Sequence, residues 1–157
     1  RQRILAGAMA SRAELPLNMD AWDGYPAARE RVFKAALEAN ANIVSLAGDT
    51  HNAWAFDLDH AGEKVGVEFG VQGVTSPGLE SYASYLPTSD LERATVAHNR
   101  QLKWMDGSRR GYMAVELTPG SAACEFRFVA SVREKGAGVN ATKRVTTLAG
   151  SRMLDVG

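Results

Sequence analysis

The apolar run Ile43–Ala47, followed at once by Gly48-Asp49-Thr50-His51, constrains the fold more than any other feature of this chain. A short run rich in β-branched residues is typical of a strand buried on both faces of a parallel sheet, although its periodicity does not by itself exclude a buried helix. Ligand sites in open α/β sheets lie just beyond the ends of such strands. The run therefore predicts an α/β fold with a candidate site at residues 48–51.

Asp49 and His51 are the candidate ligands of that site. If the backbone stays extended past Gly48, the two side chains project to the same side of the chain. A carboxylate suits hard cations such as calcium, and a neutral imidazole suits zinc, iron and other transition metals. The alternative is that Asp49 caps a turn and His51 is a satisfied loop histidine, and this alternative is the more common one for an isolated Asp-x-His motif.

Composition narrows the function classes. The chain has 157 residues, of which 45% are hydrophobic, so it has room for one domain with a core. Its 18 basic and 18 acidic side chains cancel, which gives no support for a nucleic-acid partner or a charged membrane surface. No run approaches the ~18 consecutive apolar residues of a membrane span. We therefore expect a globular chain with no nucleic-acid partner and no membrane span.

Periodicity and capping residues predict the order of the elements. Pro26 is placed to open a helix that ends near Asn40 and leads into the 43–47 strand. Ser89-Asp90-Leu91-Glu92 has the form of a capping box, which predicts a helix over 90–99. Strands are expected at 3–9, 43–47, 65–71, 111–117 and 122–129, with the last two joined in a hairpin by Thr118-Pro119-Gly120. Glycines within the 65–71 strand indicate a bulge or a close backbone approach.

The C-terminal part of the chain is expected to differ from the rest. Cys124 alternates with Phe126 and Phe128, so it is interpreted as a buried structural thiol on an inward face. From Arg133 onward, glycine, polar and basic residues replace the alternation. We therefore divide the chain into a main part over 1–130 and a loosely packed extension over 131–157, with one more strand expected near Val145–Leu148.

Four motifs occur together in a fixed order. They are Trp22-Asp23-Gly24-Tyr25-Pro26, Gly48-Asp49-Thr50-His51 with Trp54 close behind, Thr75-Ser76-Pro77-Gly78, and Gly111-Tyr112. From about Asn18 to Val129 this combination resembles the C-terminal half of the PhoD-like alkaline phosphatases, which belong to the calcineurin-like metallophosphoesterase superfamily. No single motif is specific for this family, but the order and spacing of the four motifs together are.

The resemblance implies a fold and a site. The fold would be part of a four-layer α/β/β/α sandwich with mixed sheets, and His51 and Asp49 would be the catalytic metal ligands, His51 for an iron-type ion and Asp49 for a calcium-type ion. Most of the superfamily has histidine where Asp49 stands, and an oxygen donor suits calcium better than an imidazole does. Asp20 is a weaker candidate ligand, and Trp22, Asp23 and Arg109 are candidate substrate contacts. Against these roles, Asp20 and Asp23 suit a turn and a helix start, and Arg109 suits a solvated face.

The resemblance also implies a metal-dependent phosphatase that hydrolyses phosphomonoesters, phosphodiesters or both. The family's other metal ligands come from an N-terminal half, so we expect this chain to need that half or a partner chain to complete its fold, and to be inactive alone. A periplasmic or secreted location is implied by the family. Two alternatives remain: another metallophosphoesterase branch, such as a nucleotidase or a diesterase, and a non-catalytic half-domain that serves binding or oligomerisation.

Overall fold

The structure, a computed structural model, describes residues 19–157, and the strand expected at 3–9 lies outside them. Its helical elements are η2 (Trp22–Gly24), α1 (Pro26–Glu38), α2 (Leu79–Tyr82) and α3 (Thr88–His98). Its strands are β1 (Ile43–Ala47), β2 (Ala53–His60), β3 (Glu63–Gly70), β4 (Leu102–Asp106), β5 (Gly111–Leu117), β6 (Ser121–Val129) and β7 (Val139–Leu148). The helix expected from Pro26 and the strands expected at 43–47, 65–71, 111–117 and 122–129 are confirmed to within a few residues.

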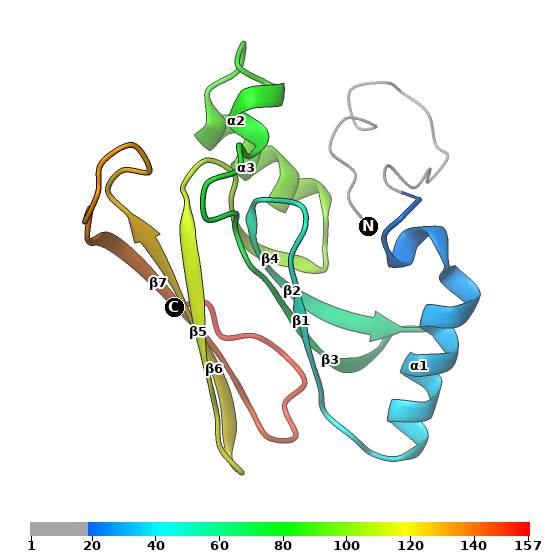
Figure 1. Ribbon diagram of the computed structural model, residues 1–157. Helices are drawn as coiled ribbons and strands as arrows, with labels where there is room; N and C mark the ends of the chain where they lie inside the picture. Colours follow the sequence, from blue (N-terminus) through cyan, green and yellow to red (C-terminus); the bar gives the residue numbers. More distant parts are fainter. Residues whose placement is uncertain (1–18) are drawn as a thin grey trace.

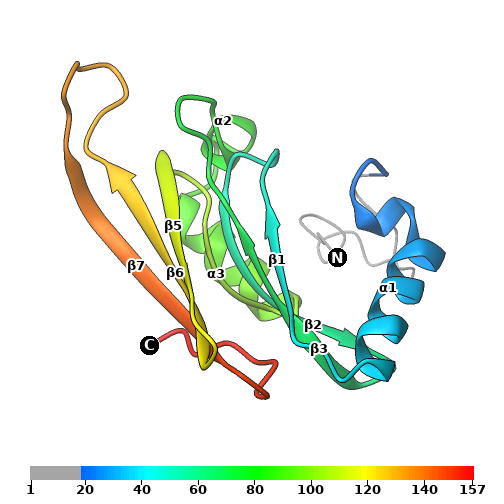
Figure 2. The ribbon, with the colours of Figure 1, turned by 60° about the horizontal axis from the view of Figure 1, so that its bottom comes forward.

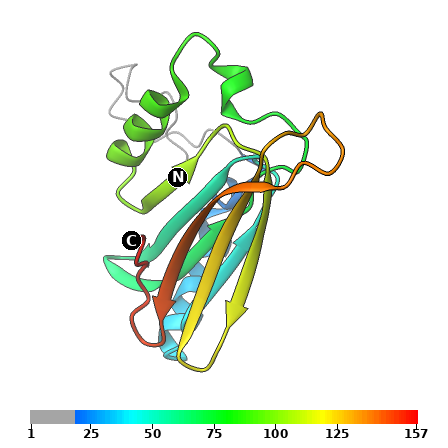
Figure 3. The ribbon, with the colours of Figure 1, turned by 90° about the vertical axis from the view of Figure 1, so that its left-hand side faces the viewer.

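The strands form two sheets that face each other (Figures 1 and 2). Sheet A is mixed, with the order β1-β3-β2-β4, and only the β1–β3 pair is parallel. Sheet B is antiparallel, with the order β5-β6-β7. Helix α1 lies on the side of sheet A that faces away from sheet B, and α3 packs near β4. No helix of residues 19–157 covers the outer face of sheet B (Figures 2 and 3). The expected α/β fold is confirmed, and three of the four expected layers are present in the described chain.

The main core lies between the two sheets. Its buried members are Ala53, Ala55, Val67 and Phe69 from sheet A and Ala122, Cys124, Phe126, Phe128 and Val145 from sheet B. The Trp104 ring of β4 packs on Phe126 of β6, with 4.9 Å between the ring centroids. Cys124 is fully buried, and burial raises the pKa of its thiol to about 12. The prediction of a buried structural thiol is therefore confirmed, because a buried, protonated thiol is a poor nucleophile and a poor metal ligand.

β1 differs from its prediction in one respect. It is parallel to β3 as expected, but it is the last strand of sheet A among the described residues, and Leu46 is 54% exposed. A strand at a sheet edge has a neighbour on one side only, which leaves part of its side chains and backbone uncovered. The expectation of a strand buried on both faces is wrong for the part of the chain that the structure describes.

Gly66 lets β1 approach β3 closely. A Cβ at this position would lie 2.1 Å from the Ile43 carbonyl oxygen, closer than any real contact. The β2–β3 register also shifts next to Gly66, between Leu58 and Asp59. Both features expected of glycine in this strand, a close approach and a bulge, are present.

Replacing Gly66 with alanine is therefore expected to push β1 away from β3 and to lower the free energy of unfolding by about 1–3 kcal/mol. Gly120→Ala is the matched control, because Gly120 lies in the β5–β6 turn and a Cβ there meets no atom within 4 Å. Urea unfolding of both variants checks the prediction. A Gly66→Ala protein as stable as Gly120→Ala would show that β1 is not packed against β3 as described.

The expectation of a loosely packed extension over 131–157 is wrong. β7 pairs with β6 along its whole length, and Val145 is 1% exposed. The segment after β7 is also anchored, because the Leu154 N–H donates to the Asp57 carboxylate at 2.9 Å. Some of the polar residues that suggested a loose segment lie in the loop between β6 and β7. Others, such as Thr142 and Arg144, are exposed on β7 in alternation with the buried Val145.

α3 begins earlier than expected and without the expected cap. Its N-cap residue is Pro87, with no side-chain capping bond. Glu92 instead accepts the Gly107 N–H at 2.7 Å, so it ties α3 to the loop after β4. Burial raises the pKa of Glu92, with Asp106 adding to the effect and the Gly107 N–H opposing it. A second apolar cluster of Trp54, Leu102 and Met105 lies against α3 through Val96.

Within residues 19–157, no helix is both long and apolar enough to cross a membrane.

Candidate metal site

The loop after β1 is a strained turn. The Thr50 N–H donates to the Gly48 carbonyl at 2.8 Å, so Asp49 is the central residue of a γ-turn with φ 70°, and His51 has φ 62°. A γ-turn with positive φ at a residue other than glycine is rare, and such strain is concentrated at functional sites. The extended backbone expected past Gly48 is wrong, so strand alternation is not what positions Asp49 and His51.

His51 is oriented by the turn at residues 75–78. Its Nδ1 lies 3.0 Å from the Pro77 carbonyl oxygen. A carbonyl oxygen only accepts, so Nδ1 carries the proton, and in the neutral ring Nε2 then bears the free lone pair. A histidine that donates one ring N–H to a carbonyl and keeps the other nitrogen free is the usual arrangement of a metal ligand. Two motifs that the sequence places 26 residues apart meet in this one contact.

Thr50, between the two candidate ligands, is held at two points. The Asn52 amide donates to the Thr50 carbonyl oxygen at 2.6 Å, and the Trp54 indole N–H donates to the Thr50 hydroxyl at 2.7 Å. Asn52 and Trp54 are 4% and 3% exposed. Buried hydrogen bonds of this kind fix the path of a loop, because breaking them leaves polar groups unsatisfied.

The turn at residues 75–78 is itself anchored by polar contacts. Asn52 Oδ1 accepts the Leu79 N–H at 2.9 Å, and the Glu80 carboxylate accepts the Gly78 N–H at 3.2 Å. Arg110 forms an ion pair with Glu80. Gly78 is required here, since a Cβ would lie 2.7 Å from Asn52 Oδ1 and 2.7 Å from the Gly107 carbonyl oxygen.

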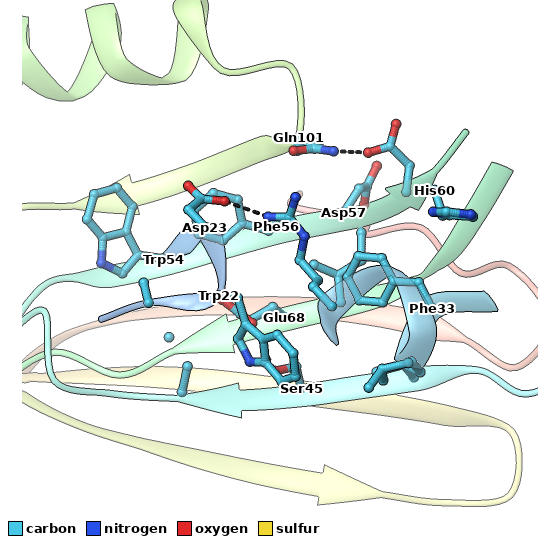
Figure 4. A pocket seen from close by; sticks show the side chains of 18 of the residues that line it. Trp22, Asp23, Phe33, Ser45, Trp54, Phe56, Asp57, His60, Glu68 and Gln101 are labelled. Carbon is cyan, nitrogen blue, oxygen red and sulfur yellow. Dashed lines mark hydrogen bonds and ion pairs between the residues drawn. The ribbon is translucent and has the colours of Figure 1, made fainter. Parts of the chain in front are cut away.

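The Asp49 carboxylate is exposed, and no side-chain hydrogen bond or ion pair engages it within the described chain. It is therefore available as an oxygen donor. It also lines a cavity of about 620 Å³ between α1 and the outer face of sheet A (Figure 4).

Three further candidate residues line the same cavity as Asp49, namely Asp20, Trp22 and Asp23. Trp22 is 51% exposed, and the Asp23 carboxylate pairs with Arg29 of α1 at 2.5 Å. The rings of Trp54 and Phe56 stack with 5.9 Å between their centroids. They form an aromatic wall of the cavity on the side of sheet A (Figure 4). The structure thus brings the 20–23 segment and Asp49 to one cavity, whereas His51 is not among the residues that line it.

Arg109 lies elsewhere. Its guanidinium pairs with Asp106 at 2.6 Å and lies over the Phe128 ring, 3.9 Å from the centroid. It is not among the residues that line the cavity. The structure therefore gives Arg109 a packing and charge-pairing role and does not bring it to Asp49.

Sequence reasoning missed several polar residues of this region. On the floor of the cavity, the Ser45 hydroxyl donates to Glu68 at 2.8 Å across the β1–β3 pair. Asn52 and the Glu80–Arg110 pair were also missed. The only signal for Asn52 was its place directly after the Asp-x-His motif, and no sequence pattern connects residues 80 and 110.

The donors fit a metal site in kind but not in number. His51 offers an imidazole nitrogen and Asp49 a carboxylate, which are the ligand types expected for a transition metal and for calcium. Within residues 19–157, no three His, Cys, Asp or Glu side chains gather closely enough to hold a metal ion. A complete site needs at least one more protein ligand than these residues supply.

Two facing sheets, with a helix on the outer side of the mixed sheet and two ligand-type side chains in a strained loop after β1, define an α/β protein with a candidate metal site at a strand end. Comparison with known families agrees: residues 2–126 match the PhoD-like phosphatase family. The chain belongs to this family, as the motifs in its sequence indicated.

Two known proteins are similar to it. Alkaline phosphatase D of Bacillus subtilis (strain 168) is 33% identical over 129 residues, which are 78% of this chain and 21% of that protein. A solved structure described as the structure of PhoD superimposes with a TM-score of 0.71 at 27% identity, covering 88% of this chain and 26% of that one. The chain therefore spans about a fifth of the length of the curated relative that it matches.

Proposed function

We propose that the protein to which this chain belongs is a metal-dependent phosphatase that hydrolyses phosphomonoesters, phosphodiesters or both. The observation that carries the proposal is the Nδ1–H contact of His51 with the Pro77 carbonyl, at 3.0 Å, which leaves Nε2 as a metal donor. Membership of the PhoD-like phosphatase family supports the reaction class.

His51 would hold an iron-type ion and Asp49 a calcium-type ion, with Asp20, which lines the same cavity as Asp49, as a further oxygen donor. Metal ions in such sites polarise phosphate oxygens and lower the pKa of water. The chain's own contribution is to hold the donors still: the γ-turn fixes Asp49, and the Pro77 carbonyl fixes the tautomer of His51. Trp22 and Asp23 would contact the phosphate ester, Trp22 as an exposed aromatic surface and Asp23 as a carboxylate held by Arg29. A phosphate-binding role for Arg109 would require it to leave Asp106.

The remaining ligands would come from the part of the protein outside these 157 residues, or from a partner chain. Two donors do not complete a catalytic site, so we propose that the 157-residue chain is inactive alone. By its family, the whole protein would act in the periplasm or outside the cell.

Metal removal tests the proposal. The whole protein, purified and treated with a chelator until elemental analysis finds no iron or calcium, is expected to lose hydrolysis of both p-nitrophenyl phosphate and bis(p-nitrophenyl) phosphate, because metals supply most of the charge stabilisation in such reactions. Adding iron and calcium back together is expected to restore it, and the ratio of the two rates then reports the ester preference. Unchanged hydrolysis by verified metal-free protein would refute metal dependence.

A further inference from the structure

We propose that Asn52 is a positioning residue that links the candidate metal-binding loop to the turn that orients His51. The proposal rests on the proposed metal-binding role of His51. It assigns to Asn52 the task of setting the His51 ring, and with it the nitrogen that is presented to a metal.

Asn52 uses both ends of its amide, one on each segment. Its Nδ2 donates to the Thr50 carbonyl at 2.6 Å, and its Oδ1 accepts the Leu79 N–H at 2.9 Å. Thr50 directly precedes His51, and Leu79 follows Pro77 by two residues. One buried side chain thus spans the two segments that meet in the His51–Pro77 contact.

Backbone contacts do little to hold the two segments together. Neither segment is a strand, and no backbone hydrogen bond joins residues 48–52 to residues 75–79 in the described chain. α2, which begins at Leu79, has four residues and no side-chain cap from its own N-cap residue, Gly78. Asn52 Oδ1 takes the place of that cap by accepting the first N–H of the helix.

The space around the amide is filled. A Cβ on Gly78 would lie 2.7 Å from Asn52 Oδ1, so the turn packs directly on the Asn52 side chain. The Trp54 indole holds Thr50 from the other side through its hydroxyl. The turn thus encloses the Asn52 amide, whose two hydrogen bonds hold the segment of Pro77 next to that of His51. A contact such as that between Pro77 and His51 sets which ring nitrogen carries the proton.

The test uses the whole protein, metal-free and labelled with ¹⁵N-histidine, and reads the ring nitrogen shifts of His51, assigned by their loss in His51→Ala. Wild type is expected to show the Nδ1–H tautomer. Asn52→Ala is expected to move the population toward the Nε2–H tautomer. Asn52→Asp, which keeps the acceptor for the Leu79 N–H but loses the donor to the Thr50 carbonyl, is expected to move it less. Asn52→Leu, similar in size and without either hydrogen bond, replaces Asn52→Ala if that variant does not fold.

The second measurement is the affinity for Zn²⁺, used as a probe that imidazole binds well. Asn52→Ala is expected to bind Zn²⁺ about 10–100-fold more weakly, the usual effect of losing a residue that orients a ligand. Asn99→Ala is the matched control: Asn99 is also buried and donates to a backbone carbonyl, that of Thr95 at 2.7 Å, but it makes no hydrogen bond to residues 48–52 or 75–80.

The outcomes distinguish a failure of the positioning role of Asn52 from a failure of the metal-binding role of His51. If Asn52→Ala keeps the Nδ1–H tautomer and a Zn²⁺ affinity within about twofold of Asn99→Ala, Asn52 has only a structural role and the inference is overturned. If His51→Ala binds Zn²⁺ as tightly as wild type, the metal-binding role of His51 fails, and the tautomer shift alone then decides whether Asn52 positions the ring.

Discussion

His51→Ala is expected to lower kcat/KM of the whole protein for phosphate esters by at least about 100-fold and to remove the iron-type metal. Losing a partner that merely orients a metal ligand costs about 10–100-fold, so losing the ligand itself should cost at least the upper end of that range. The His51 ring makes one hydrogen bond within the described chain and belongs to neither apolar cluster, so the fold should survive the substitution. Steady-state kinetics and elemental analysis of the purified variant measure the effect.

His98→Ala is the matched control, because His98 is an exposed histidine in the last turn of α3. It should keep wild-type metal content and activity. Full activity in His51→Ala would show that the Gly48-Asp49-Thr50-His51 loop is an ordinary turn and would refute the site.

Asp57→Ala is expected to lower the free energy of unfolding by about 3 kcal/mol, the largest stability effect that we predict for this chain. The Asp57 side chain is 0% exposed and lies near two ammonium groups, Lys64 at 3.3 Å and Lys103 at 3.5 Å. Its other oxygen accepts the Leu154 N–H. Removing the carboxylate leaves two lysines without their counter-ion and the Leu154 N–H without its acceptor. The effect falls at the lower end of the usual range because both lysines are 32% exposed.

Urea unfolding measures this effect, and an unchanged m-value shows that the change is one of stability. Asp57→Asn should lose less than Asp57→Ala, since an amide oxygen still accepts the Leu154 N–H. Asp90→Ala is the control, because Asp90 and its partner Arg93 are 53% and 77% exposed, and such surface pairs contribute about 0–1 kcal/mol. If Asp57→Ala were no less stable than Asp90→Ala, Asp57 would not join sheet A to the C-terminal segment.

Local patterns in the sequence predicted the elements that depend on local preferences. Pro26 opens α1, the alternation of residues 122–129 places Cys124, Phe126 and Phe128 in the core, and Thr118-Pro119-Gly120 joins β5 to β6. β2 was not predicted. Carboxylates are rarely fully buried unless they are paired, and Asp57 of this strand is buried beside Lys64 of β3 and Lys103 of β4, two other strands of sheet A.

The candidate site likewise has features that local sequence predicted and features that only the tertiary structure decided. The residue types of Asp49 and His51 marked the loop as a candidate metal site, and the order of the four motifs indicated the family. The backbone that carries them was not predictable from an extended-strand argument, since the positive φ angles of Asp49 and His51 are strained and persist only where surrounding contacts hold them. Those contacts come from Asn52, Trp54 and Pro77.

By itself, then, the sequence determined the α/β class, the PhoD-like family and which two side chains offer metal-ligand chemistry. Only the tertiary structure decided that β1 lies at a sheet edge, that β7 belongs to the fold, and that the Pro77 carbonyl selects the tautomer of His51. The physical reason is separation along the chain: propensity and spacing act over a few residues, whereas the hydrogen bond that orients His51 joins residues 26 positions apart, and the one that anchors the C-terminal segment to Asp57 joins residues 97 apart.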